Sequence, residues 1–409
     1  MRRLFPTAIL VLLLFVGGLS AFDAVGTLKK VDAEKHILFV HAGGQDREVK
    51  IAKDVKVLGT DGKPLADGLK AKELKEGAEV TITVEREDYQ PIIKAIRLGK
   101  HVGAGPGPAP EGGKATVGFK PLSEMSATDK YKGEDGGLYG AGKNEPPAAH
   151  QAAAKNETAK IVPLDAAGKS APDGIIGLVS ISMSNATQEF SKFKEIADKD
   201  ADKSSLLKIV DCAQGGQAMA QWVDPKAKAW TEAARRLEAA KVSPKQVQIA
   251  WIKLANVRPT GELTEHGKKL QQDTLIVIQN AKARFPNLRI IYLSSRIYAG
   301  YASTPLNPEP YAYEGAFAVR WLIQDQMKGD AELNYDAARG AVKAPVLLWG
   351  PYLWGDGTTP RKSDGLVWDR SDLGGDGTHP SPSGQRKVAE LMLKFFKNDP
   401  YARGWFVKS

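Results

Sequence analysis

Short apolar runs alternate with amphipathic stretches through the second half of this chain, and this alternation limits the possible folds more than any other feature. The apolar runs span residues 175–181, 206–210, 247–254, 289–293 and 346–349. Between them, residues 230–237 and 270–285 carry apolar side chains at helical spacing. Strands separated by helices imply a parallel sheet with helices on both faces. We therefore predict an α/β domain over residues 171–409.

Two regions of different composition precede this domain, in a chain of 409 residues that is too long for one core. Residues 22–100 alternate β-type runs with the turn signals Gly43-Gly44 and Asp61-Gly62, which predicts a small all-β module resembling an OB or SH3-like barrel. Residues 101–170 are rich in Gly, Pro, Ala and Lys, which predicts a flexible linker. The apolar residues between Val117 and Tyr139 could dock on the following domain.

The N-terminal segment indicates export. Residues 1–21 contain Arg2 and Arg3, then an apolar core, then a small-residue stretch, the pattern of a secretory signal peptide. We expect a secreted protein or one of the periplasm or cell envelope. Contact with a membrane is expected only if this segment stays uncleaved, because it approaches the length that spans a bilayer.

Charge and cysteine content exclude other classes. The net charge is +9, but the lysines are scattered and are not interleaved with aromatic residues in one block, so we expect no nucleic-acid partner. Cys212 is the only cysteine, which excludes an intramolecular disulfide. We interpret it as a small buried residue and not as a nucleophile.

Asp376 and His379 lie three residues apart in a glycine-rich turn just before the last amphipathic stretch. A carboxylate at this spacing on a constrained loop can fix the orientation and tautomer of the imidazole. The other ring nitrogen is then free to take a proton from a serine. The histidines elsewhere in the sequence form no convincing ligand cluster with this pair, so we expect no metal.

The other predicted strand ends supply groups that complement this pair. Ser184 follows the first strand of the α/β domain, Gly216 follows the second, and Asn256 follows the third. In an open parallel sheet, reactive groups gather beyond the carboxyl ends of the strands. A serine nucleophile, a glycine N–H, an amide donor and an acid–base pair are the set that acyl transfer requires.

At these residues the chain resembles the SGNH (GDSL-like) hydrolase superfamily, over residues 172–409. The pair Ser184-Asn185 and the Gly215-Gly216 turn are most similar to the carbohydrate-esterase branch with a Gly-Gln-Ser-Asn-Met block. The resemblance implies a flavodoxin-like three-layer sandwich around a central parallel sheet. It also implies a catalytic triad formed by Ser184, Asp376 and His379. The implied oxyanion hole consists of the Gly216 N–H, the Asn256 amide and the Ser184 N–H.

The predicted function is that of an exported serine esterase, which hydrolyses an O-acetyl ester of a carbohydrate through an acyl-enzyme and needs no cofactor. Tyr298, Tyr352 and Trp354 are candidate substrate-binding residues, because they follow the fourth and fifth strands. Ser182 and Met183 differ from the residues that the family carries at these positions. The alternative is therefore a catalytically silent protein of the same fold that binds glycans or builds the envelope.

Overall fold

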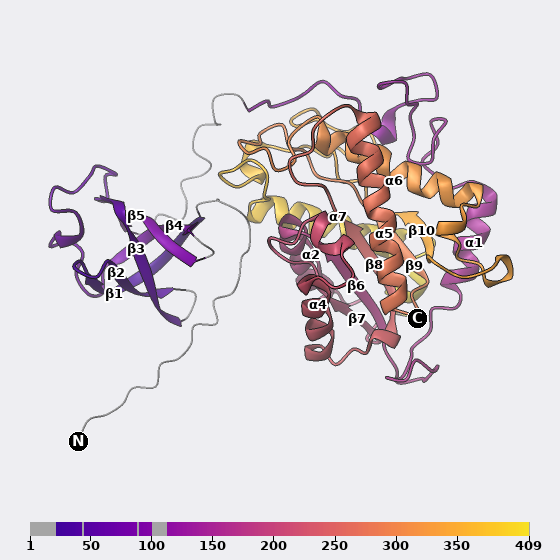
Figure 1. The fold of residues 1–409 in the computed structure, drawn as a ribbon, viewed down its shortest axis with the longest axis horizontal. Coiled ribbons are helices and arrows are strands. Elements are labelled where there is room, and N and C mark those ends of the chain that lie inside the picture. The colour runs from indigo at the N-terminus through magenta and orange to yellow at the C-terminus, as the bar shows by residue number, and fades with distance from the viewer. Residues whose placement is uncertain (1–21, 43–44, 88–89, 100–112, 409) are drawn as a thin grey trace. The chain divides into compact units, whose positions relative to one another are not determined.

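The computed structural model describes residues 22–42, 45–87, 90–99 and 113–408 (Figure 1). These residues form two compact units, one ending at Gly99 and one beginning at residue 113. The predicted signal peptide, residues 1–21, lies outside the described residues. Within the described ranges, no helix is long and apolar enough to cross a membrane.

The first unit is a closed β-barrel with the strand order β1-β2-β3-β5-β4. β3 and β5 pair in parallel, and the other neighbouring strands pair antiparallel. Alternate side chains of each strand point inward and build a separate apolar core. This confirms the small all-β module, and its barrel is of the OB type. The strands are β1 (Phe22–Asp32), β2 (Ile37–Ala42), β3 (Gln45–Leu58), β4 (Glu79–Glu87) and β5 (Gln90–Leu98).

The second unit is built on a parallel sheet with the strand order β10-β9-β8-β6-β7. Counted along the domain, this is the order 5-4-3-1-2 of a flavodoxin-like fold, as predicted. The strands are short and buried over most of their length, which explains their continuous apolar sequences. They are β6 (Ile176–Ser182), β7 (Leu207–Val210), β8 (Val247–Lys253), β9 (Ile290–Leu293) and β10 (Val346–Trp349).

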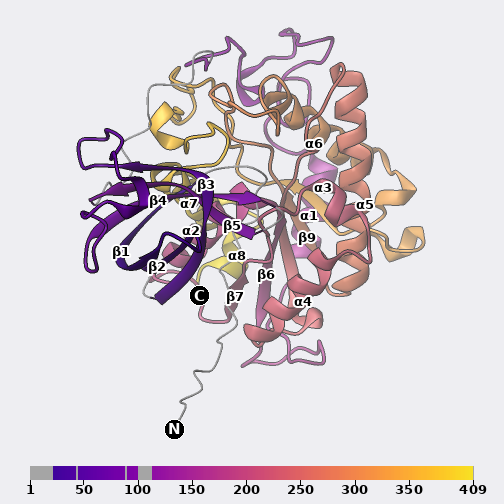
Figure 2. The same cartoon turned by 60° about the vertical axis from the view of Figure 1, so that its left-hand side comes forward.

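Helices cover this sheet in two groups. α2 packs against α7, which packs in turn against the short α8, whereas α5 packs against α3 and α6. α5 runs beside α6 in both views of the molecule (Figures 1 and 2). The helices are α1 (Ala148–Thr158), α2 (Ser184–Ala197), α3 (Met219–Val223), α4 (Lys228–Ala239), α5 (Lys268–Arg284), α6 (Tyr311–Lys328), α7 (Pro382–Asn398) and α8 (Arg403–Phe406).

Residues 113–170 belong to the α/β unit, so the prediction of a flexible linker was wrong for them; residues 101–112 lie outside the described residues. Leu122, Met125 and Tyr139 are buried in the core of the α/β domain. A Gly- and Pro-rich segment has too few apolar residues to build a core of its own. It is ordered here because the neighbouring domain supplies one.

Polar contacts also fix this segment to the domain. The buried Arg320 of α6 pairs with Glu134 and Asp135. The buried carboxylate of Glu314, also on α6, accepts a hydrogen bond from the Tyr131 hydroxyl at 2.7 Å. These contacts attach residues 131–135 of the segment to α6.

Candidate active site

The nucleophile candidate lies at the junction between β6 and α2. β6 ends at Ser182 and α2 begins at Ser184, so the serine hydroxyl stands at the carboxyl edge of the sheet. Met183 between them is extended, with φ −106° and ψ −172°. Ser182 and Met183 are not among the described non-glycine residues with positive φ, so this turn needs no glycine. The departure from the family pattern at these two positions is therefore compatible with an unstrained turn.

Ser182 itself ties the junction to the neighbouring elements. Its hydroxyl donates to the carbonyl of Lys253 on β8, and its carbonyl accepts from the backbone N–H of Gln214 at 3.0 Å. The indole of the buried Trp222 donates to the same carbonyl at 3.2 Å. A glycine at 182 would lose the first of these contacts.

Ser184, His379 and Asp376 form one chain of hydrogen bonds. The Ser184 Oγ lies 2.7 Å from His379 Nε2. On the other side of the ring, His379 Nδ1 lies 2.6 Å from Asp376 Oδ2. With the Nδ1 hydrogen directed at the carboxylate, Nε2 is left to accept the serine proton. The predicted three residues are therefore brought into direct contact.

The Asp376 carboxylate is held in its charged form by its surroundings. Its Oδ1 accepts the backbone N–H groups of Thr378 and His379, each at 3.0 Å. Burial by itself raises the pKa of Asp376, but the hydrogen bond and charge of His379 and these two N–H groups outweigh it and hold the pKa at about 2. The carboxylate is therefore charged at any pH near neutrality and can stabilise an imidazolium.

The loop that carries this pair is locked in place. The N–H of Gly374 donates to the carbonyl of His379 at 2.7 Å and closes the turn. Gly377 has φ +63°, and a Cβ atom there would lie 1.8 Å from the carbonyl oxygen of Tyr301. Only glycine fits this position, because both the backbone conformation and the close approach exclude a side chain.

The two candidate oxyanion donors follow the strands on either side of β6. Gly216 lies in the loop after β7, is exposed, and has φ +72°. Asn256 lies three residues after the end of β8 and is half-buried, and its carbonyl accepts a hydrogen bond from Asn307 Nδ2 at 3.3 Å. Because β7, β6 and β8 are adjacent, both residues lie at the same edge of the sheet as Ser184.

Tyr298, Tyr352 and Trp354 do not face a substrate, so the prediction that they bind one was wrong. Tyr298 and Trp354 are fully buried, and Tyr352 is 7% exposed. The hydroxyl of Tyr298 donates to the Lys114 carbonyl at 2.7 Å, and that of Tyr352 accepts the Leu122 N–H at 3.1 Å. The two tyrosines therefore bind the 113–145 segment, whereas the Trp354 indole donates to Glu309 Oε1 at 2.8 Å.

The structure also reveals a buried ion pair, on the helix that begins at Ser184, that the sequence did not single out. Glu189 of α2 pairs with Lys253 of β8, and both side chains are 0% exposed. Burial raises the pKa of Glu189 and lowers the pKa of Lys253 to about 8. Lys253, a charged residue at the end of a mostly apolar strand, was the sequence signal of this pair.

Two other kinds of reactive site were considered from the sequence, a cysteine nucleophile and a metal site. The Cys212 thiol is buried, and burial raises its pKa, so it is not an activated nucleophile. In the part of the chain that the structure describes, no group of three or more His, Cys, Asp or Glu side chains is arranged to hold a metal ion.

Comparisons with known proteins give fold-level likenesses only. No family model and no curated protein matches this chain. Apo-CusF from Escherichia coli is similar over 24% of this chain and 100% of its own length, with 13% identity and a TM-score of 0.16. A gut microbial diltiazem-metabolizing enzyme is similar over 56% of this chain and 47% of its own, with 15% identity and a TM-score of 0.30.

A third similar structure is the periplasmic domain of a lipopolysaccharide acetyltransferase from Salmonella ser. Paratyphi A. It covers 54% of this chain and 84% of its own length, with 14% identity and a TM-score of 0.28. TM-scores and identities this low establish neither a family nor an activity. The function has to be inferred from the site itself.

Proposed function

We propose that this protein is an exported serine esterase whose reaction takes place at Ser184. The observation that carries the proposal is the hydrogen-bonded chain from Ser184 Oγ to His379 Nε2, 2.7 Å, and from His379 Nδ1 to Asp376 Oδ2, 2.6 Å. A serine, an imidazole and a carboxylate in this sequence of contacts are a recurrent device for activating a hydroxyl.

The reaction proceeds in two steps. His379 Nε2 removes the Ser184 proton as Oγ attacks the acyl carbonyl, and the same proton then passes to the departing alcohol. Water next attacks the acyl-enzyme and gives a proton to His379. His379 then passes this proton to Ser184 Oγ as the bond to the acyl carbon breaks, which releases the acid and restores the free serine. In each step the oxyanion is stabilised by the N–H groups of Ser184 and Gly216 and the Asn256 amide. The residues that act need no cofactor.

For the substrate we propose an O-acetyl ester of a carbohydrate. The Ser184-Asn185 pair and the Gly215-Gly216 turn, which resemble those of the carbohydrate-esterase branch, support this class. The signal-peptide pattern of residues 1–21 supports export to the periplasm, the cell envelope or the medium, where such esters are accessible.

The test is covalent labelling of the serine together with hydrolysis. We expect an organophosphonate to add one adduct to the peptide that contains Ser184, and Ser184→Ala to prevent it. Acetylated sugars and short nitrophenyl esters should be cleaved by the wild type. A wild-type protein that is neither labelled nor active on any of these esters would be the catalytically silent alternative.

A further inference from the structure

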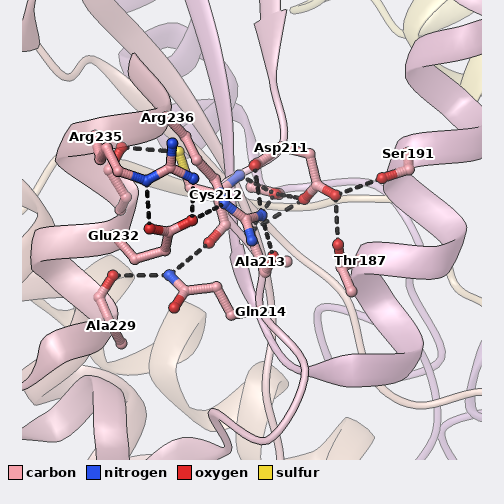
Figure 3. Close-up of polar contacts among 12 residues, drawn as sticks. Thr187, Ser191, Asp211, Cys212, Ala213, Gln214, Ala229, Glu232, Arg235 and Arg236 are labelled. Atoms are coloured by element: carbon pink, nitrogen blue, oxygen red, sulfur yellow. Dashed lines mark hydrogen bonds and ion pairs between the residues drawn. The ribbon is translucent and has the colours of Figure 1, made fainter. Parts of the chain in front are cut away.

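Asp211 stands directly after β7, and its carboxylate collects hydrogen bonds from three different elements (Figure 3). From α2, the hydroxyls of Thr187 and Ser191 donate to Oδ2 at 2.5 and 2.6 Å. From β6, the Ser180 hydroxyl donates to Oδ1 at 2.6 Å. The N–H of Ala213, in the loop after β7, donates to Oδ1 at 3.1 Å. One side chain therefore joins a helix, a strand and a loop.

The helix in question is the one that carries the nucleophile. Ser184, Thr187 and Ser191 are spaced three and four residues apart on α2, so they lie on one face of the helix. Asp211 thus binds the same face from which Ser184 reaches His379. A rotation of α2 about its axis would break the contacts with Asp211 and displace the Ser184 hydroxyl at the same time.

The loop in question leads to the candidate oxyanion glycine. The Ser180 Oγ accepts the N–H groups of Cys212 and Ala213, both at 3.0 Å. On the other side, Arg236 Nη1 donates to the carbonyls of Asp211 and Ala213 at 3.0 and 2.7 Å, as Figure 3 shows. The start of the loop is therefore fixed against β6 and α4, and Asp211 contacts both elements, because its carboxylate accepts from Ser180 and its carbonyl accepts from Arg236.

Burial raises the pKa of Asp211, whereas the hydroxyls of Ser180, Ser191 and Thr187 lower it by donating to the carboxylate. An apolar contact could join the same elements without the cost of burying a carboxylate. A carboxylate differs in accepting several short, directional hydrogen bonds, which fix a helix in rotation as well as in position. A carboxylate at position 211 is therefore better suited to placing α2 accurately than to stabilising the fold.

We propose that Asp211 is a positioning residue, which holds the Ser184 helix and the Gly216 loop in the relative placement that the oxyanion step requires. This inference rests on the proposed acyl transfer at Ser184. Asp211 does not touch the reacting atoms and acts only through Thr187, Ser191 and the loop.

The first test measures kcat and KM of Asp211→Asn. Titration with the organophosphonate gives the concentration of reactive serine, to which kcat is referred. We expect kcat to fall about ten- to hundredfold, because a small misplacement of a reacting group has effects of this size, while KM changes by less than about twofold. The titre of reactive serine should stay at the wild-type value. A lower titre with an unchanged kcat per titrated site would mean that Asp211 supports folding alone, and would overturn the proposal.

A second test does not depend on activity. In a crystal structure of Asp211→Asn, the separation of Ser184 Oγ and His379 Nε2 should exceed the wild-type 2.7 Å. An unchanged separation would refute the positioning role even if the wild type hydrolyses no ester. Absence of labelling and hydrolysis in the wild type would refute the proposed esterase instead, so the two failures are distinguishable.

Two further variants complete the design. Thr187→Val combined with Ser191→Ala removes only the donors on α2, and should lower kcat by about several-fold if the helix is what Asp211 positions. Glu195→Gln removes an exposed carboxylate of the same helix that pairs with Lys192 and Lys199, and should leave kcat unchanged. Equal kcat for the double variant and the control would contradict the proposal.

Discussion

Two pairs that each contain a carboxylate, one in contact with Ser184 and one further along the same helix, differ mainly in their access to solvent. Asp376 and His379 remain 12% and 17% exposed, whereas Glu189 and Lys253 are both 0% exposed. The first pair ends in a ring nitrogen that contacts Ser184. The second is enclosed between α2 and β8 and offers no atom to a substrate. The first pair is therefore accessible at the edge of the sheet, whereas the second is enclosed in the interior.

The largest expected effect falls on the exposed pair. Asp376→Asn should reduce kcat about 10⁴-fold, because an amide no longer holds the tautomer in which Nε2 accepts a proton. Ester hydrolysis measures kcat, and circular dichroism checks that the fold persists. Asp198→Asn, an exposed acid at the end of α2, is the matched control and should behave as wild type. Near-normal activity of Asp376→Asn would exclude the triad.

The enclosed pair should respond in stability. Lys253→Met removes the cation that pairs with the buried Glu189, so we expect unfolding to require about 3–5 kcal/mol less free energy. Glu189→Leu combined with Lys253→Met removes both charges and should recover most of this loss. Urea unfolding gives both values. If the single and double variants are equally unstable, the pair owes its effect to packing and the comparison with Asp376–His379 loses its basis.

Asn256→Ala tests the candidate oxyanion donor, which should affect kcat and not stability. Loss of one oxyanion donor typically lowers kcat about 10²- to 10³-fold, with little effect on KM. The half-buried side chain is not part of a core, so the unfolding free energy should stay close to that of the wild type. Unchanged kcat would remove Asn256 from the site without affecting the triad.

The pH dependence of stability should identify Asp376 as the charged member of its pair. Its pKa is about 2 in the folded protein against an ordinary 3.8. Between these values the unfolded chain binds more protons than the folded one, so stability rises with pH. The contribution should be complete above about pH 5 and disappear as the pH falls toward about 2. Unfolding measured across this window should show a shallower slope for Asp376→Asn.

The smallest effect concerns the buried aromatic residues. Tyr298→Phe deletes the hydroxyl that donates to the Lys114 carbonyl, and should cost about 1 kcal/mol of unfolding free energy. KM should not change, because the ring is covered by the protein itself. A several-fold rise in KM would restore the interpretation of Tyr298 as a substrate-binding residue.

The sequence predicted the strands of the α/β domain well because buried parallel strands have continuous apolar sequences. The run 346–349 coincides with β10, the run 175–181 is shifted by one residue from β6, and the other three runs differ from the observed strands by one residue at one end. Asp376 and His379 were recognisable because three residues and a glycine-rich turn suffice to bring them together. Ser184 was recognisable because it follows a strand directly, and the carboxyl ends of parallel strands lie at one edge of the sheet.

Asp211 and Glu189 were not recognisable in this way. A carboxylate after a strand or on a helix is usually a surface residue, and only its neighbours show otherwise. The partners of Asp211 on α2 are Thr187 and Ser191. The partner of Glu189 is Lys253, and 253 − 189 = 64 positions separate the two residues. Pairings over such distances are set by how the helix packs on the sheet, and no local pattern encodes them.

The amino-acid sequence alone determined what depends on short-range chemistry. This comprises the barrel and the α/β class, the polar residues that follow successive strands, and the Asp376-x-x-His379 turn. The tertiary structure decided what depends on burial. It ordered residues 113–170 on a core that they do not supply, enclosed Tyr298 and Trp354, and made Asp211 a junction of three elements. The physical reason is that periodicity reports which face of an element is apolar, whereas the free energy of a polar or isolated aromatic side chain depends on which distant atoms surround it.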